Sequence, residues 1–214
     1  MRFPKRISFG FLAVALLLGL LMWPATTRQG VNCKVTEKRI PVAIKAMDFL
    51  VRDYEYRHLA AEITRGIPTE EAKAEALFQW TREHIRPIPP EWPLVDDHIG
   101  HIIIRGYGAE DQMADVFCTL ATYAGIPSFW KVLHAPDAQD DRHYVISFVR
   151  IQGRWTVWEV SGRASSAQLK GWERFADPVP PVLRAQIQMP LPRLLCELQR
   201  VGRRLLGRPP ETDE

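Results

Sequence analysis

The sequence predicts an α+β domain in which one central helix packs on an antiparallel β-sheet. Residues 110–124 carry apolar side chains at helical spacing, behind a glycine-bearing loop and ahead of a Gly-Ile-Pro sequence that ends the helix. Residues 128–133 are apolar and aromatic, as strands are. Residues 143–160 form two alternating runs around a Gln-Gly pair, which is typical of a hairpin. We therefore expect a three-stranded sheet covered by the central helix.

Composition and charge fit one globular domain with appendages. The chain has 214 residues, of which 46% are hydrophobic and 25% charged, with a formal net charge of +3. These fractions are ordinary for a globular protein with a sizeable core. Most of the excess positive charge lies near the two ends of the chain, and the middle is close to neutral. A basic face for nucleic acid is therefore not expected.

An apolar segment follows three basic residues at the N-terminus. Residues 7–23 are almost wholly apolar, and as a helix they would span about 25 Å, which is marginal for a bilayer. The preceding basic residues favour a cytoplasmic N-terminus. We predict that residues 1–28 form an uncleaved single-pass membrane anchor, with the domain on the extracytoplasmic side. A cleaved signal peptide is the alternative, so extracytoplasmic placement holds in either case.

The rest of the chain divides into a domain and a C-terminal extension. We predict that residues 37–177 form the domain and that residues 178–214 form a proline-rich linker and a basic amphipathic helix. Within and before the domain, the patterns predict further segments: a linker at 29–37, helices at 40–63 and 69–86, a proline-rich connection at 87–108, and a short helix around 169–175.

The cysteines and histidines indicate neither a disulfide pattern nor a metal centre. Cys33, Cys118 and Cys196 contain no Cys-x-x-Cys pair, and the sequence leaves open which of them pair. Cys118 lies inside the central helix, where a small buried residue is the ordinary interpretation. His98 and His101 stand beside two aspartates, but no further histidine or cysteine follows at a zinc-site spacing. We therefore predict a solvated loop there, and no metal or cofactor.

The stretch from the glycine loop to the Gly-Ile-Pro sequence, residues 105–127, resembles the centre of the transglutaminase-like superfamily, whose fold is related to papain-like cysteine proteases. In that family a glycine loop delivers a nucleophilic cysteine to the first turn of a helix, an alanine follows one turn later, and Gly-Ile-Pro ends the helix. Ala114 and the Gly-Ile-Pro sequence place the nucleophile position at Glu110. Asp111 is expected to cap the helix, whose dipole is expected to lower the pKa of Glu110.

The hairpin resembles the two strands that carry the rest of the family's triad. There a histidine opens the first strand, and an acid follows four residues after a tryptophan in the second. His143 and Trp155 match this pattern, and Glu159 occupies the acid position. The resemblance therefore implies that Glu110, His143 and Glu159 stand at the three triad-equivalent positions.

The functional prediction depends on position 110, where a glutamate stands in place of the family's cysteine. A carboxylate cannot form the thioester through which the family transfers acyl groups, so we expect a non-catalytic domain that acts as a structural module or binds a peptide or glycan. Four residues are candidate ligand contacts, although the aromatics among them also suit a core: Tyr107, Asp111, Trp130 and Trp158. Two alternatives stay open: a hydrolase or acyl transferase using Glu110 and His143, or a metal site built on Glu110, His143 and Glu159.

Overall fold

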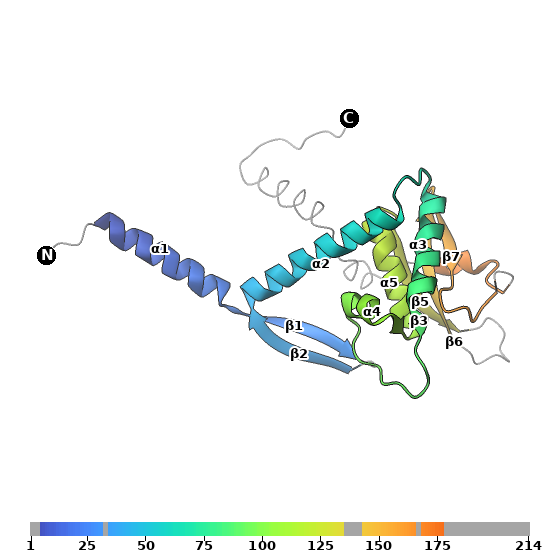
Figure 1. Ribbon diagram of the computed structural model, residues 1–214, viewed down its shortest axis with the longest axis horizontal. Helices are drawn as coiled ribbons and strands as arrows, with labels where there is room; N and C mark the ends of the chain where they lie inside the picture. The colour runs from blue at the N-terminus through green and yellow to red at the C-terminus, as the bar shows by residue number, and fades with distance from the viewer. Residues whose placement is uncertain (1–4, 32–33, 135–142, 166–167, 178–214) are drawn as a thin grey trace.

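The computed structural model describes residues 5–31, 34–134, 143–165 and 168–177 (Figure 1). Its helices and strands follow in this order: α1 Lys5–Leu21, β1 Pro24–Val31, β2 Lys34–Pro41, α2 Val42–Ile63, α3 Glu70–His84, β3 Arg86–Pro87, α4 Ile99–Arg105, β4 Tyr107–Gly108, α5 Glu110–Tyr123, β5 Ser128–His134, β6 His143–Ile151, β7 Arg154–Trp158, and the 3₁₀ helix η1 Trp172–Ala176. The predicted C-terminal linker and helix lie outside the described residues.

The central helix α5 packs on a three-stranded antiparallel sheet, as the sequence predicts. The strand order is β5-β6-β7, with Ser128 opposite Val149 and Ile151 opposite Arg154. At the β6–β7 turn, Gln152 and Gly153 have φ values of 49° and 80°. Positive φ at both turn residues matches the twist that a two-residue hairpin requires, and glycine adopts it without strain.

Both faces of the sheet are covered, so β6 is buried nearly throughout. On one face Val149 and Ile151 join the main core, which lies between the sheet and helices α2, α3 and α5. On the other face Ile146 and Phe148 pack against Trp172 of η1. This double burial explains why β6 reads as a mostly apolar run rather than a strict alternation.

The Gly-Ile-Pro sequence ends α5 as expected. Gly125 has φ 86°, and the backbone N–H of Ile126 donates to the carbonyl of Ala121 at 2.9 Å. This hydrogen bond gives a partner to a carbonyl that has none within the helix. The turn that forms it needs a residue that accepts positive φ, which glycine does. Ile126 is 1% exposed, so the turn also anchors the helix end in the core.

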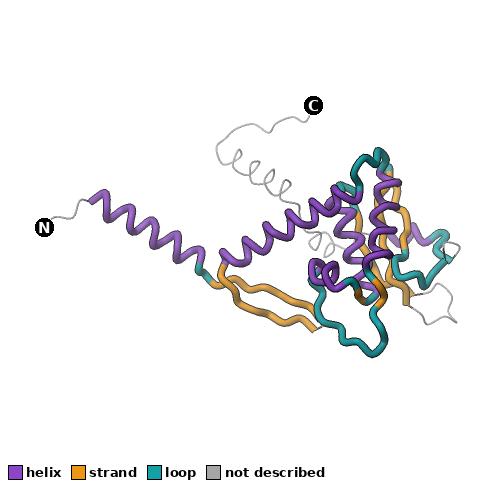
Figure 2. The backbone as a smooth tube through the Cα atoms, viewed as in Figure 1, coloured by secondary structure: helices purple, strands orange, loops and turns teal. Residues whose placement is uncertain are grey.

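Two predicted loops contain regular structure. The described residues of the predicted linker at 29–37 belong to two antiparallel strands, with Gln29 of β1 paired with Thr36 of β2. Figure 2 shows the two strands side by side. The proline-rich connection at 87–108 contains helix α4, which buries Ile99 and Ile102 against the core. Both predictions were wrong because short elements give weak periodic signals, and tertiary contacts decide whether they form.

The N-terminal segment is helical over Lys5–Leu21. In the described part of the chain, no helix has both the length and the apolar content needed to cross a bilayer.

Candidate functional site

The N-terminus of α5 is held by Gln112 rather than by the predicted cap Asp111. The side-chain oxygen of Gln112 accepts from the backbone N–H of Ala109 at 3.1 Å and from the guanidinium of Arg105 at 2.8 Å. Its amide donates to the side chain of Asp97 at 2.7 Å. Among the residues that the structure describes, Asp111 accepts a hydrogen bond from the adjacent N–H of Gln112 alone, at 2.9 Å, so the predicted Asp111 cap was wrong.

Gln112 therefore ties the glycine loop, α4 and the preceding connection to α5. It is 3% exposed, and its side chain lies so close to Gly108 that a Cβ there would stand 3.1 Å away. This role of Gln112 was not among the predictions from the sequence. The available signal was its place three residues after the N-cap, where a glutamine side chain reaches back to the N-cap N–H.

Glu110 begins α5 and is paired with an arginine. Its carboxylate lies 2.6 Å from the guanidinium of Arg163, in the loop after β7. Burial raises the pKa of Glu110 above its usual value, and the negative charges of Glu159 and Asp111 add to this effect, while Arg163 opposes it. The expectation that the helix dipole lowers this pKa was wrong, because burial is the largest contribution.

The carboxylate of Glu159 stabilises the loop that carries Arg163. It is 6% exposed. Its carboxylate accepts from the backbone N–H of Ser161 at 2.8 Å and of Ala164 at 3.2 Å, and also contacts the Ser161 hydroxyl. A carboxylate that accepts several hydrogen bonds fixes a turn strongly. Glu159 thereby positions Arg163 beside Glu110.

His143 stands apart from this arrangement in its contacts. It opens β6, is exposed, and faces His134 of β5, with ring centroids 4.9 Å apart. Among the described residues, no hydrogen bond joins His143 to either glutamate. The structure therefore links Glu110 and Glu159, two of the three residues predicted to be triad-equivalent, through the Arg163 loop. The triad equivalence and the catalytic roles of all three stay predictions.

The four candidate ligand residues occupy different places. Tyr107 packs edge-on against Trp92, with ring centroids 4.9 Å apart, and Trp130 donates its indole N–H to Asp115 at 3.2 Å. Asp111 is exposed on the first turn of α5. Trp158 donates to the hydroxyl of Thr156 at 2.8 Å and lines a pocket.

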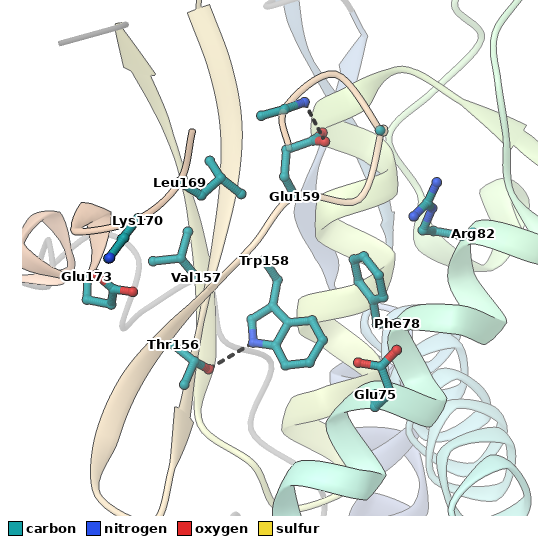
Figure 3. A pocket seen from close by; sticks show the side chains of 12 residues that line it. Glu75, Phe78, Arg82, Thr156, Val157, Trp158, Glu159, Leu169, Lys170 and Glu173 are labelled. Atoms are coloured by element: carbon teal, nitrogen blue, oxygen red, sulfur yellow. Dashed lines mark hydrogen bonds between the residues drawn. The ribbon is translucent and has the colours of Figure 1, made fainter. Parts of the chain in front are cut away.

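That pocket has a volume of about 570 Å³ and lies between α3, β7 and the segment that leads to η1 (Figure 3). Phe78 and Trp158 form an aromatic wall, with ring centroids 5.1 Å apart. Charged side chains of both signs surround it, including Arg82 from α3 and Lys170 and Glu173 from the opposite side. The pocket therefore combines an aromatic surface with a polar rim.

The thiol of Cys118 offers no substitute nucleophile. It is 5% exposed, and burial raises its pKa to about 12. A thiol with such a pKa stays protonated near neutral pH and is a poor nucleophile. The prediction that Cys118 is a buried core residue is confirmed, and Cys33 and Cys196 lie outside the residues whose side chains are described.

A metal centre is not formed by the candidate residues. Within the ranges that the structure describes, no three His, Cys, Asp or Glu side chains gather as metal ligands. The alternative built on Glu110, His143 and Glu159 therefore has no support. The His98 and His101 pair belongs to the start of α4, where His101 bonds to Asp96 at 3.1 Å.

Comparisons with solved structures found partial matches at low sequence identity. One is a candidate cysteine protease from Cytophaga hutchinsonii, with 15% identity and a TM-score of 0.45 over 55% of this chain and 42% of that one. A second is a candidate protease from Parabacteroides distasonis, with 14% identity and a TM-score of 0.39 over 63% of this chain and 35% of that one. A third is described as a TGase, with 11% identity and a TM-score of 0.42 over 71% and 48%.

The chain thus spans less than half the length of each of these structures. A search of curated proteins found no significant match.

The family comparison is more specific, because residues 57–160 match the family described as the Transglutaminase-like superfamily. This match runs from the second half of α2 through β7, and it contains the glycine loop, α5 and the hairpin. Residues 57–160 therefore belong to the transglutaminase-like superfamily.

Proposed function

We propose that this transglutaminase-like domain is non-catalytic and binds a peptide or glycan in the pocket beside Trp158. One observation carries the non-catalytic part of the proposal: Glu110, at the position that the family resemblance gives to the nucleophile, is held by Arg163 at 2.6 Å. A carboxylate lacks the nucleophilic strength of a thiolate and cannot form a thioester. The ion pair with Arg163 further lowers the nucleophilic strength of the Glu110 carboxylate.

The binding part of the proposal is supported by the pocket. Its volume of about 570 Å³ lies in the range of ligand sites in proteins. Aromatic rings such as Trp158 and Phe78 offer apolar faces on which a sugar ring or an apolar side chain can stack. The charged rim, including Arg82 and Lys170, can bond to hydroxyls or to a peptide backbone.

The test combines a binding measurement with an activity measurement on the full chain in detergent. The protein is screened against peptide and glycan arrays, and turnover is measured with glutamine and lysine peptides and with amide and ester substrates. We expect binding without turnover. Arg82→Ala should weaken the binding of a ligand found in this way by about tenfold, the loss of one good polar contact. Arg65→Ala removes an exposed arginine outside the pocket and should leave binding unchanged.

The same experiment can contradict each part separately. Ligand binding that is insensitive to Arg82→Ala would reject the pocket as its site. Turnover that Glu110→Gln abolishes would reject the non-catalytic assignment and favour the alternative, a hydrolase or acyl transferase that uses Glu110. A specific observation keeps that alternative in view, since burial raises the pKa of Glu110 in the direction that a general base needs.

The proposal also places the domain outside the cytoplasm, attached through the apolar residues 7–23. Its support is the sequence: basic residues before the apolar run favour a cytoplasmic N-terminus. In cells that express the full chain, we expect the protein in the membrane fraction, resistant to high salt, and accessible to protease from the extracytoplasmic side. Release by salt or carbonate, or cleavage of the N-terminal segment in the mature protein, would contradict an uncleaved anchor.

A further inference from the structure

The pocket beside Trp158 lies along the outer edge of strand β7. Thr156, Val157 and Trp158 all line it. Because successive side chains of a strand point to opposite faces, a pocket that touches three consecutive residues follows the edge of the strand rather than one face. Figure 3 shows Val157 and Trp158 pointing to opposite sides of β7. β7 ends the strand order β5-β6-β7, so no strand within the described residues pairs with this edge.

The backbone of this edge carries hydrogen-bonding groups that point into the pocket. A two-residue turn joins β6 to β7, and antiparallel residue pairs alternate between hydrogen-bonded and non-hydrogen-bonded ones from such a turn onward. The N–H and C=O groups of Thr156 and Trp158 therefore point to β6, whereas those of Trp155 and Val157 point outward. In the described part of the chain, these outward groups have no hydrogen-bond partner. An extended polypeptide offers donors and acceptors at the matching spacing, and a glycan does not.

Helix α3 forms one wall of the groove, and the segment that leads to η1 forms the other. The charges along the α3 wall have an order. Arg82 lies near the loop after β7, since a Cβ on Gly162 would stand 3.4 Å from its guanidinium. Glu75 lies toward the Thr156 end of β7, and Phe78 lies between the two charges (Figure 3). The wall therefore presents a positive, an aromatic and a negative side chain in sequence.

We propose that this groove binds an extended segment of another protein, which adds to β7 as a fourth, antiparallel strand. Antiparallel is the direction of the existing sheet, and it is the more stable pairing. Every second side chain of the bound segment then faces α3. From its N-terminus, these are an acid opposite Arg82, an apolar residue beside Phe78, and a base opposite Glu75. This inference rests on the proposed function, because it names the ligand of the same pocket as a peptide rather than a glycan.

The spacing of the two charges suits such a segment. Arg82 and Glu75 are seven helical positions apart, a rise of about 10 Å. Residues four positions apart in a strand are separated by about 14 Å. Long charged side chains bridge the difference, so an acid and a base at the first and fifth positions reach both ends of the α3 wall.

The probes are capped heptapeptides of sequence Ser-Glu-Thr-Z-Thr-Lys-Ser, in which Z is Phe, Trp, Leu or Met, together with the same peptides in reverse order. The two orders have equal composition and charge, so non-specific attraction does not distinguish them. Binding to the full chain in detergent is measured by fluorescence anisotropy. We expect the best forward peptide to bind at least tenfold more tightly than its reverse, because reversal brings like charges together at both ends of α3.

N-methylation of single peptide bonds tests the strand pairing itself. In the proposed register, the threonine before the lysine lies opposite Val157 and directs its N–H to β7, whereas the N–H of the lysine points away. Methylating the threonine nitrogen should weaken binding about tenfold, through the loss of one backbone hydrogen bond. Methylating the lysine nitrogen should leave binding unchanged. Recognition through side chains alone would not separate these two neighbouring amides.

Exchanging the two charges on α3 provides the matched protein variant. Glu75→Lys combined with Arg82→Glu keeps the net charge and replaces two exposed side chains, so the helix should persist. This variant should bind the reverse peptide at least tenfold more tightly than the forward one. A partly unfolded protein would lose both peptides and would not reverse the preference.

Several results would overturn the inference. Equal binding of forward and reverse peptides, or equal effects of the two N-methyl groups, would reject the antiparallel strand. Peptide binding that weakens as the protein concentration rises would assign the edge to a second copy of this chain. If no heptapeptide binds but an array ligand sensitive to Arg82→Ala is found, this inference fails and the proposed function stands. If the arrays also yield no ligand, the binding part of the proposed function fails with it.

Discussion

Replacing Phe117 with alanine is expected to lower the free energy of unfolding by about 4 kcal/mol. Phe117 is fully buried in α5. Its ring meets Phe78 of α3 edge-on, with centroids 5.7 Å apart, and lies 5.9 Å from the ring of Trp158 in β7. Removing the ring would leave a cavity where α3, α5 and the sheet meet, and the neighbouring rings can close it only in part. Urea denaturation of the full chain, followed by tryptophan fluorescence, measures the change.

The matched variant for this prediction is Phe117→Leu. Leucine fills most of the same space, so the expected loss is about 1.5 kcal/mol. Trp158 also lines the pocket, and the alanine variant should therefore weaken ligand binding as well, through a displaced wall rather than a lost contact. A loss below about 1 kcal/mol for Phe117→Ala would contradict the packing of these three rings at the centre of the domain.

Asp115→Asn is expected to stabilise the domain at pH 7.5 by about 2 kcal/mol. Asp115 lies on the sheet-facing side of α5, where Trp130 donates to its carboxylate. Burial raises its pKa to about 6, and the charges of Asp111 and Asp97 act in the same direction, while the bond from Trp130 opposes them. Asparagine keeps an oxygen that can accept from Trp130 but carries no charge, so the neutral side chain removes the unfavourable ionisation.

The direction of this pH dependence follows from the number of protons bound by the folded protein and by the unfolded chain. Because the pKa is higher in the folded protein than in the unfolded chain, the folded protein alone keeps this proton between about pH 4 and pH 6. The contribution of Asp115 to stability therefore falls as the pH rises through this range and is at its least favourable above it. Denaturation at pH 4.5 and pH 7.5 should show a clearly larger gain for Asp115→Asn at the higher pH, since the unfolded chain is already partly ionised at pH 4.5.

Glu83→Gln is the control for this pH dependence. Glu83 is an exposed acid on α3, so its substitution changes the net charge equally without removing the half-buried carboxylate of Asp115. The difference in stability between the two pH values should then match that of the original protein. Equal gains from Asp115→Asn at both pH values, or a loss at pH 7.5, would contradict a raised pKa at this position.

Helices and strands with strong local patterns were predicted from the sequence, and those with weak patterns were not. Helix α5 and strands β5 to β7 were predicted close to their bounds, because their apolar periodicity is long and their ends carry glycine or proline. The β1–β2 hairpin and α4 were missed. α4 has only seven residues, and its formation depends on burying Ile99 and Ile102 against a core that the local sequence does not contain.

The candidate site shows the same division. The sequence placed Glu110 on the first turn of α5 and Glu159 within the second strand of the hairpin. The structure ends that strand at Trp158 and brings both glutamates to the loop of Arg163. No pattern indicated Arg163, and the position of Gln112 three residues after the N-cap indicated only its bond to the N-cap N–H. Arg163 lies 53 positions from Glu110, and the bonds from Gln112 to Asp96 and Asp97 span 16 and 15 positions, so such contacts leave no periodic trace in the sequence.

The sequence by itself indicated the superfamily and the central helix on its antiparallel sheet, and it predicted that Glu110 occupies the nucleophile position. These follow from local chemistry: apolar periodicity, glycine and proline at helix ends, and the identity of single residues. Tertiary structure alone decided that Glu110 is paired with Arg163, that Glu159 folds a turn, and that burial rather than the helix dipole sets the direction of the Glu110 pKa. Charge, burial and hydrogen-bond partners depend on segments that meet only after folding, so neighbouring residues in the chain do not specify them.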